Sequence, residues 1–160
     1  MVLVREITAD DWELMRDVRL SALAEAPYAF GSTYAREAAY TEERWRGRIS
    51  ERSATFFAHE DPAVPAPAGL AAVYAGDGTA ELVSMWVRPS SRGRHVGEAL
   101  IEAAARWAGE RGFGALLLWV TESNSAARRL YERCGFSATG ERQPLPSDPA
   151  LPEIRMRRDL

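Results

Sequence analysis

Residues 115–121, ALLLWVT, are an almost unbroken apolar run, and this run restricts the possible folds more than any other stretch of the chain. A strand with one face in water alternates apolar and polar residues, so a strand without alternation is expected to be covered on both sides. Helical patterns flank the run at residues 96–111 and at residues 125–133, which Asn124 can cap and Gly135 can stop. A buried strand between two helices predicts a mixed α/β fold.

The other segments extend this alternation over the whole chain. Further strands are expected at residues 2–7, 54–59, 69–76, 81–87, 136–142 and 153–160, and further helices at residues 12–26 and 41–50. The order is β-α-α-β-β-β-α-β-α-β-β, with about seven strands and about four helices. The proline-rich stretches DPAVPAPAG and QPLPSDPALP are expected to connect strands. A chain of 160 residues without internal repeats is expected to form a single domain over residues 1–160.

Charge and cysteine content argue against several classes of function. The net charge of −3 disfavours nucleic acid as a partner. A single cysteine, Cys134, excludes an internal disulfide and a multi-cysteine zinc site, and with only His59 and His95 available no metal site is expected. The opening residues, MVLVREITADDWELM, carry charges and no sustained apolar stretch, so neither a signal peptide nor a membrane anchor is expected. We therefore expect a cytoplasmic protein without a membrane partner.

The segment VRPSSRGRHVGEALIEAA, residues 87–104, is the first candidate binding site. Turn-forming and cationic residues end a strand and stand at the start of a helix, where free backbone N–H groups and the helix dipole favour an anion. Arg92 and Arg94 add positive charge, and Gly93 and Gly97 permit close approach of the backbone. A plain surface turn explains the same residues. Neither the nucleotide-binding P-loop nor the dinucleotide fingerprint is matched, because their lysine and glycine spacings are missing.

With this loop the chain resembles the GNAT superfamily of acetyl-CoA-dependent N-acetyltransferases. The family motif Arg/Gln-x-x-Gly-x-Gly/Ala is matched by residues 92–97, RGRHVG, and a second family segment is matched by residues 124–136, NSAARRLYERCGF. The order of strands and helices matches as well, over nearly the whole chain. The resemblance implies the GNAT fold, a mixed central sheet splayed between its fourth and fifth strands. His95 replaces the first glycine of the motif, so its side chain either points to solvent or contacts phosphate.

The resemblance also implies acetyl-CoA as the acetyl-donor cosubstrate and a set of residues that bind it. The loop amides hold the pyrophosphate, the amide of Asn124 bonds the pantetheine arm, and Val87 and its neighbour pair with pantetheine amides. Asn124 also serves as a plain helix cap in the alternative interpretation. The implied cofactor-binding residues are Met85, Trp86, Val87, Arg92, Gly93, Arg94, His95, Val96, Gly97, Asn124 and Tyr131.

Two catalytic residues follow from the resemblance, Glu81 and Tyr131. Glu81 is the implied general base, because acylation of an ammonium group requires loss of a proton, directly or through water. Tyr131 is the implied acid that protonates the departing thiolate, and the Met85 N–H polarises the thioester carbonyl. The roles of Glu81 and Tyr131 each have an ordinary alternative. A glutamate at a strand start is usually solvated, and a buried tyrosine is usually a core residue. Cys134 is expected to be a packed residue and not a nucleophile.

The acceptor is expected to be an amine, bound opposite the cofactor by the loop after the first helix and by the last hairpin. In other family members the base stands at the position of Trp119, and tryptophan cannot accept a proton. Tyr28, Phe30, Tyr34 and Trp119 are the candidate acceptor-binding residues, although Tyr28 and Phe30 fit an ordinary loop core equally well. Two functions remain open: an N-acetyltransferase that works by direct transfer in a ternary complex, and an acyl-CoA-binding regulatory module without turnover. A small-molecule amine is favoured over a protein amine, and a homodimer is left open.

Overall fold

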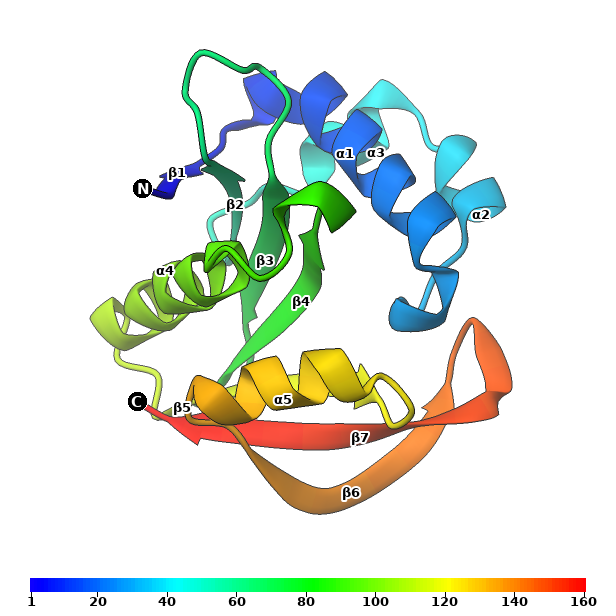
Figure 1. Ribbon diagram of the computed structural model, residues 1–160, viewed down its shortest axis with the longest axis vertical. Coiled ribbons are helices and arrows are strands. Elements are labelled where there is room, and N and C mark those ends of the chain that lie inside the picture. Colours follow the sequence, from blue (N-terminus) through cyan, green and yellow to red (C-terminus); the bar gives the residue numbers. More distant parts are fainter.

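The computed structural model describes all 160 residues and contains one mixed sheet of seven strands in the order β1-β2-β3-β4-β5-β7-β6 (Figure 1). The strands are β1 (Leu3–Glu6), β2 (Ser53–His59), β3 (Gly69–Ala75), β4 (Ala80–Val87), β5 (Ala115–Thr121), β6 (Ser137–Leu145) and β7 (Asp148–Asp159). The helices are α1 (Trp12–Glu25), α2 (Tyr34–Ala38), α3 (Glu42–Gly47), α4 (Val96–Glu110) and α5 (Ser125–Arg133). The seven expected strands are all present, so the mixed α/β fold is confirmed.

The structure has five helices where the sequence suggested about four, because α2 interrupts a segment that was expected to be loop. Thr33 caps this helix by accepting a hydrogen bond from the Arg36 N–H at 3.2 Å. Inside it, Glu37 is only 2% exposed and is bonded by Arg19 of α1. A buried ion pair therefore holds α2 against α1. Such a helix has no apolar periodicity from which the sequence could predict it.

The last two strands run farther than expected. The stretch QPLPSDPALP was expected to be a connection, yet its ends are paired, with Pro144 opposite Pro152, and the hairpin turns only around Pro146 and Ser147. The expectation was wrong because Pro144 lies in the edge strand β6, while Pro149 and Pro152 lie in the part of β7 that extends past its pairing with β5, which ends at Glu153. A proline is tolerated in an edge strand, where a missing N–H need not break the ladder.

The sheet opens between its two parallel strands. β4 pairs with β5 only at Ala80–Leu116 and Glu81–Leu117, and beyond these pairs the strands diverge. Figure 1 shows the result, with α4 and β1 to β4 on one side of the opening and α5 with β5 to β7 on the other. The splay that the resemblance implied is therefore present.

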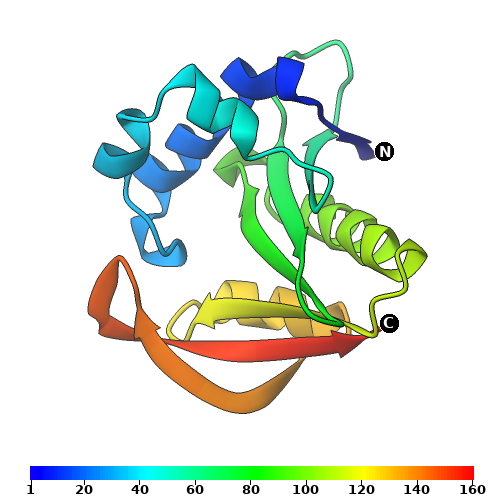
Figure 2. The same ribbon diagram turned by 180° about the vertical axis from the view of Figure 1, so that it is seen from behind.

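Two apolar cores lie on opposite faces of the sheet. The larger core packs α4 and α5 against one face, and the smaller one packs α1 and α3 against the other face of β2, β3 and β4. No helix covers the second face of β5 and β7 (Figure 2). Leu117 and Trp119 on that face of β5 are therefore partly exposed, so β5 is covered on one side only and not on both. None of the helices combines the length and the apolar character that crossing a membrane requires.

Candidate active site

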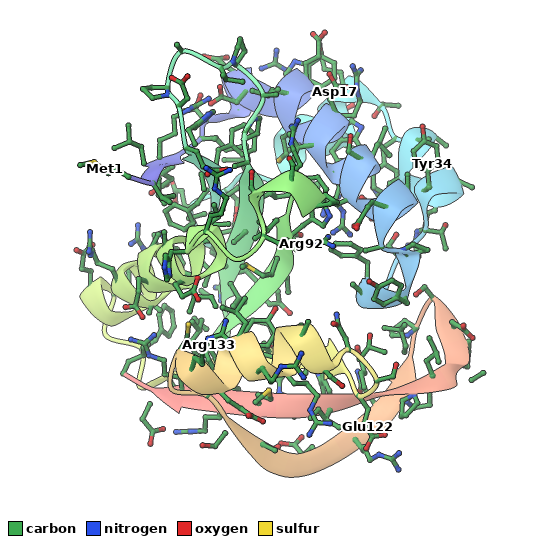
Figure 3. The ribbon with its side chains drawn as sticks, viewed as in Figure 1. Met1, Asp17, Tyr34, Arg92, Glu122 and Arg133 are labelled. Carbon is green, nitrogen blue, oxygen red and sulfur yellow. The ribbon has the colours of Figure 1, made fainter.

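A pocket of about 360 Å³ occupies the opening between the diverging strands. Its walls come from four segments: the turn after α1, the end of β4, the loop and first turn of α4, and the pocket-facing side of α5 with Asn124 before it. Figure 3 shows Arg92 of the loop and Arg133 of α5 on opposite sides of this opening. The cofactor-binding residues expected from the sequence that line the pocket are Met85, Trp86, Val87, Arg92, Gly93, His95, Val96, Gly97, Asn124 and Tyr131. Of that set, Arg94 alone does not line it.

The loop before α4 presents a run of free backbone donors. No N–H from Gly93 to Glu98 has a hydrogen-bond acceptor in the protein, and the first bonded amide is that of Ala99, which donates to the carbonyl of His95. Gly93 and His95 both have left-handed backbone conformations, with φ of 76° and 67°. These turns fold the loop over the start of the helix, where the helix dipole adds positive potential. This geometry suits an anion such as a pyrophosphate.

The two loop arginines are engaged by glutamates that sequence reasoning did not identify. Arg92 donates to Glu25 at 2.9 Å and to the Val87 carbonyl at 3.1 Å, and Arg94 pairs with Glu60 at 3.0 Å. Glu25 stands at the end of α1 and also accepts from the indole N–H of Trp86. The groups of the loop that remain without a protein partner are therefore mainly the backbone amides, because the charges of both arginines are paired.

The conformation of His95 explains why the motif has glycine at this position. Its left-handed φ of 67° is strained for a residue with a Cβ, at about 1–2 kcal/mol. The side chain is exposed and stands at the pocket, so both solvent contact and phosphate contact fit the geometry.

A bulge in β4 brings the strand backbone toward the pocket. Ser84 and Met85 together stand opposite the single residue Ala71 of β3, and Ser84 has a left-handed φ of 59°. A bulge changes the direction in which the neighbouring side chains point, and bulges and strained residues are common at functional sites. Here Met85 faces the pocket between the strands, while Ser84 faces the other side of the sheet.

Asn124 and Tyr131 line the pocket from α5. The Asn124 carbonyl oxygen accepts the Ala127 N–H at 3.3 Å and caps the helix, and its amide nitrogen has no protein partner. Tyr131 is 7% exposed, packs its ring on Phe136, and its hydroxyl has no protein partner. Burial and the nearby Cys134 raise the pKa of Tyr131 above its usual range, so its hydroxyl stays protonated. Both side chains keep donors available to a ligand.

Glu81 lies outside this pocket, on the opposite face of the sheet. Its two carboxylate oxygens accept hydrogen bonds from the two terminal nitrogens of Arg155 on β7, one of them at 2.8 Å. Both side chains are 14% exposed, and the guanidinium stacks over Trp119 with its carbon 4.9 Å from the ring centroid. Arg155 thus joins Glu81 to Trp119, and sequence reasoning missed it because the partners are 74 residues apart.

The expected acceptor residues are not brought together. Tyr28 is half-exposed at the edge of the pocket, and its carbonyl accepts from Thr121 at 2.6 Å. Phe30 is 5% exposed and packs in the smaller core. Tyr34 stands exposed on α2 (Figure 3), and neither Tyr34 nor Trp119 of β5 lines the pocket.

A second pocket, of about 270 Å³, lies on the other side of β4. It is enclosed by α1, the end of α3, and the faces of β2, β3 and β4 that bear Thr55, Tyr74 and Ser84. Arg19 and Arg48 also line it. Ser84 in this pocket and Met85 in the first are consecutive residues, so the β4 bulge separates the two pockets.

Comparisons with known proteins agree with this geometry. The model of the family described as "Acetyltransferase (GNAT) family" matches residues 12–136. The mycothiol acetyltransferase of Rhodococcus erythropolis is 32% identical over 131 residues, which are 79% of this chain and 43% of that protein. This chain therefore spans less than half of that relative's length.

Solved structures share the fold over almost the full chain. A GCN5-related N-acetyltransferase from Kribbella flavida is 26% identical with a TM-score of 0.74, and the match covers 99% of this chain and 98% of that one. An acetyltransferase of the GNAT family from Streptococcus pneumoniae is 20% identical with a TM-score of 0.79, covering 100% and 99%.

Proposed function

Because the chain belongs to the acetyltransferase (GNAT) family, we propose that its 160 residues form one N-acetyltransferase domain that moves the acetyl group of acetyl-CoA to a small-molecule amine. The observation that carries this proposal is the row of six unbonded amides, Gly93 to Glu98, at the mouth of the pocket between the splayed strands. An elongated ligand with a pyrophosphate at one end and a pantetheine arm at the other fits that arrangement. The second pocket, across the bulge, provides a place for the acceptor.

The chain's own groups supply each part of the transfer. The amine nitrogen forms a bond to the thioester carbon, the carbon–sulfur bond breaks, and coenzyme A leaves as a thiolate. The Met85 N–H in the bulge stabilises the negative charge on the carbonyl oxygen. Tyr131 donates its proton to the thiolate, and Glu81 accepts the proton lost by the amine, directly or through water. Arg155 engages one site on each Glu81 oxygen, and a carboxylate has about four, so Glu81 keeps acceptor capacity.

Direct transfer in a ternary complex is favoured by the position of the two pockets. Met85 borders the first pocket and its neighbour Ser84 the second, so the proposed donor and acceptor sites lie next to one another across the bulge, and the transfer needs no covalent enzyme intermediate. Cys134 has no histidine or carboxylate hydrogen-bonded to it, and burial raises the pKa of its thiol, so it is not an activated nucleophile.

Cofactor binding is expected to be visible without any acceptor. Acetyl-CoA and CoA should raise the melting temperature, and at a hundred times the dissociation constant the gain of about 2.7 kcal/mol corresponds to roughly 5–10 °C for a domain of this size. Dephospho-CoA should also bind, because the amides address the pyrophosphate. A differential scanning fluorimetry series measures this, and no shift with any CoA species contradicts the proposal. Binding without thiol release across an amine panel would instead indicate an acyl-CoA-binding regulatory module.

Tyr131→Phe is expected to lower turnover by less than the about 10²-fold typical of a lost general acid, because a thiolate already leaves readily. CoA affinity should stay within a few-fold, since the hydroxyl does not hold the pyrophosphate. The raised pKa of Tyr131 means that the wild-type phenol keeps its proton up to at least pH 10, so raising the pH should not mimic the variant. Thiol-release rates between pH 7 and 10 test this, with Tyr40→Phe as the matched control. Unchanged turnover in Tyr131→Phe removes the acid role.

A further inference from the structure

The second pocket has a wall of unusual charge. Its lining includes two arginines, Arg19 and Arg48, together with hydroxyl groups, and no carboxylate. The hydroxyl-bearing residues in the lining are Ser53, Thr55, Tyr74 and Ser84. Cations and hydroxyl donors around a small, partly closed space favour an anion, because charges interact more strongly away from bulk water.

One carboxylate lies behind this wall and neutralises part of its charge. Glu37 accepts from Arg19 through Nε and Nη2, both at 2.9 Å, and from Arg48 through Nη1 at 2.9 Å. Burial is the largest single influence and opposes its ionisation, but Arg19, with smaller contributions from Ser32 and Arg48, outweighs it, and together they lower the pKa of Glu37 to about 2. Glu37 is therefore ionised at neutral pH, and the two cations and one anion leave the cluster with a net positive charge.

Arg48 is the arginine of this cluster that has hydrogen-bond donors without a protein acceptor. Arg19 is 7% exposed and uses its third nitrogen on the Ser84 hydroxyl at 3.4 Å. The side chain of Arg48 is 32% exposed, its guanidinium lies over the Trp45 ring, and its Nε and Nη2 have no acceptor. A guanidinium held in place with two free donors is a ready partner for a carboxylate.

The geometry places this anion site beside the reacting groups. Ser84 lines the pocket and stands next to Met85 in the bulge. Tyr74, also in the lining, is the cross-strand partner of Glu81. Burial raises the pKa of Tyr74, and the negative charge of Glu81 raises it further. A molecule with its anionic group at Arg48 therefore has the bulge on one side, and Glu81, the cross-strand partner of Tyr74, lies just outside the lining. The volume of about 270 Å³ suits a small metabolite.

We propose that the acceptor is a small amine that also carries a carboxylate, as amino acids do, and that Arg48, positioned by Glu37 beside Arg19, binds that carboxylate. This inference rests on the proposed acetyl transfer and adds to it the chemical class of the acceptor.

Matched acceptors test the carboxylate directly. Amino acids and their carboxamides, which keep the amine and side chain but lack the negative charge, are compared by thiol release from acetyl-CoA. We expect a lower KM for the acid of each pair. Arg48→Gln should raise the KM of the acids roughly 10- to 100-fold, as for a lost hydrogen bond between charged groups, and leave the carboxamides nearly unchanged. Arg48→Lys should restore part of the difference.

A matched control separates a binding role from a folding role. Arg46 lies in the last turn of α3, two residues before Arg48, and pairs with Asp10 and Glu42 outside the pocket, so Arg46→Gln should leave both KM values as in the wild type. Arg48→Gln removes the hydrogen bond from Arg48 to the buried Glu37 but keeps the two from Arg19, so its melting temperature should fall only modestly below that of the control variant and the protein should stay folded. Equal losses for acids and carboxamides in Arg48→Gln overturn the inference.

A binding experiment covers the case in which no member of the panel is acetylated. Saturation-transfer NMR of the same amino acids with the CoA-loaded protein should give signals that weaken in Arg48→Gln and persist in Arg46→Gln. If no acid gives an Arg48-dependent signal, the inference is wrong even where other amines are acetylated. Failure of CoA itself to bind is a different result, which overturns the proposed transfer.

Discussion

Glu81→Gln is expected to lower turnover about 10²-fold or more, the usual effect of losing a general base, while CoA affinity stays within a few-fold. The glutamine keeps the shape of the side chain but cannot accept the proton of the amine. Raising the pH should partly rescue the variant, because a larger share of the acceptor is then already neutral. Thiol-release rates for wild type and variant between pH 6.5 and 9.5 measure both effects.

The ion pair with Arg155 gives this experiment its control. Arg155→Gln removes the same two-point contact but leaves the carboxylate in place, so it should lose much less turnover and show no added rescue at high pH. Removing one partner of a largely buried pair lowers stability in both variants. If Arg155→Gln reproduces the loss and the pH response of Glu81→Gln, the carboxylate holds the site together and is not the base. Normal turnover in Glu81→Gln would mean that an ordered water or another side chain accepts the proton of the amine.

Elements that bury an apolar face were predictable from the sequence, and elements held by polar contacts were not. The run at residues 115–121 and the helical pattern at 96–111 correspond to β5 and α4, because burial imposes periodicity on a chain. α2 has five residues and is anchored by the Arg19–Glu37 ion pair, which leaves no periodic signal. The apolar residues of β5 that face away from α5 look like core in the sequence but stand on an open face.

In the candidate site, too, the local motifs were predictable from the sequence and the long-range polar contacts were not. The loop at residues 92–97 and the capped helix after Asn124 are local motifs, and the structure brings both to one pocket. Glu25, Glu60 and Arg155 pair with Arg92, Arg94 and Glu81 respectively, but they are distant from these partners in the chain and carry no motif of their own. Long-range ion pairs of this kind arise from the topology of the sheet, so they become visible only once the strands are placed.

Gly97→Val is expected to weaken CoA binding roughly tenfold or more, which is the cost of about 1–3 kcal/mol usual for overpacking a close contact. A Cβ at Gly97 would lie 2.8 Å from Cδ2 of Leu130 and 3.3 Å from Cε of Met85. Both of those side chains line the first pocket, so the space that valine takes must come from the pocket or from the approach of α5 to α4. Isothermal titration with CoA, alongside the melting temperature without ligand, measures the effect.

Two neighbouring variants show whether the effect is specific to Gly97. Ser84→Ala removes a hydroxyl on the other side of β4 and should leave CoA affinity within a few-fold, because Ser84 does not face the cofactor pocket. His95→Gly relaxes a left-handed residue at the same helix start, so it should keep the amides in place. A several-fold loss of affinity in His95→Gly would show that the imidazole contacts phosphate. Because Leu130 and Met85 end in flexible groups, Gly97→Val should lose more CoA affinity than stability. Unchanged CoA affinity in Gly97→Val would mean that α5 moves aside freely, and that close packing of α4 on α5 does not shape the cofactor pocket.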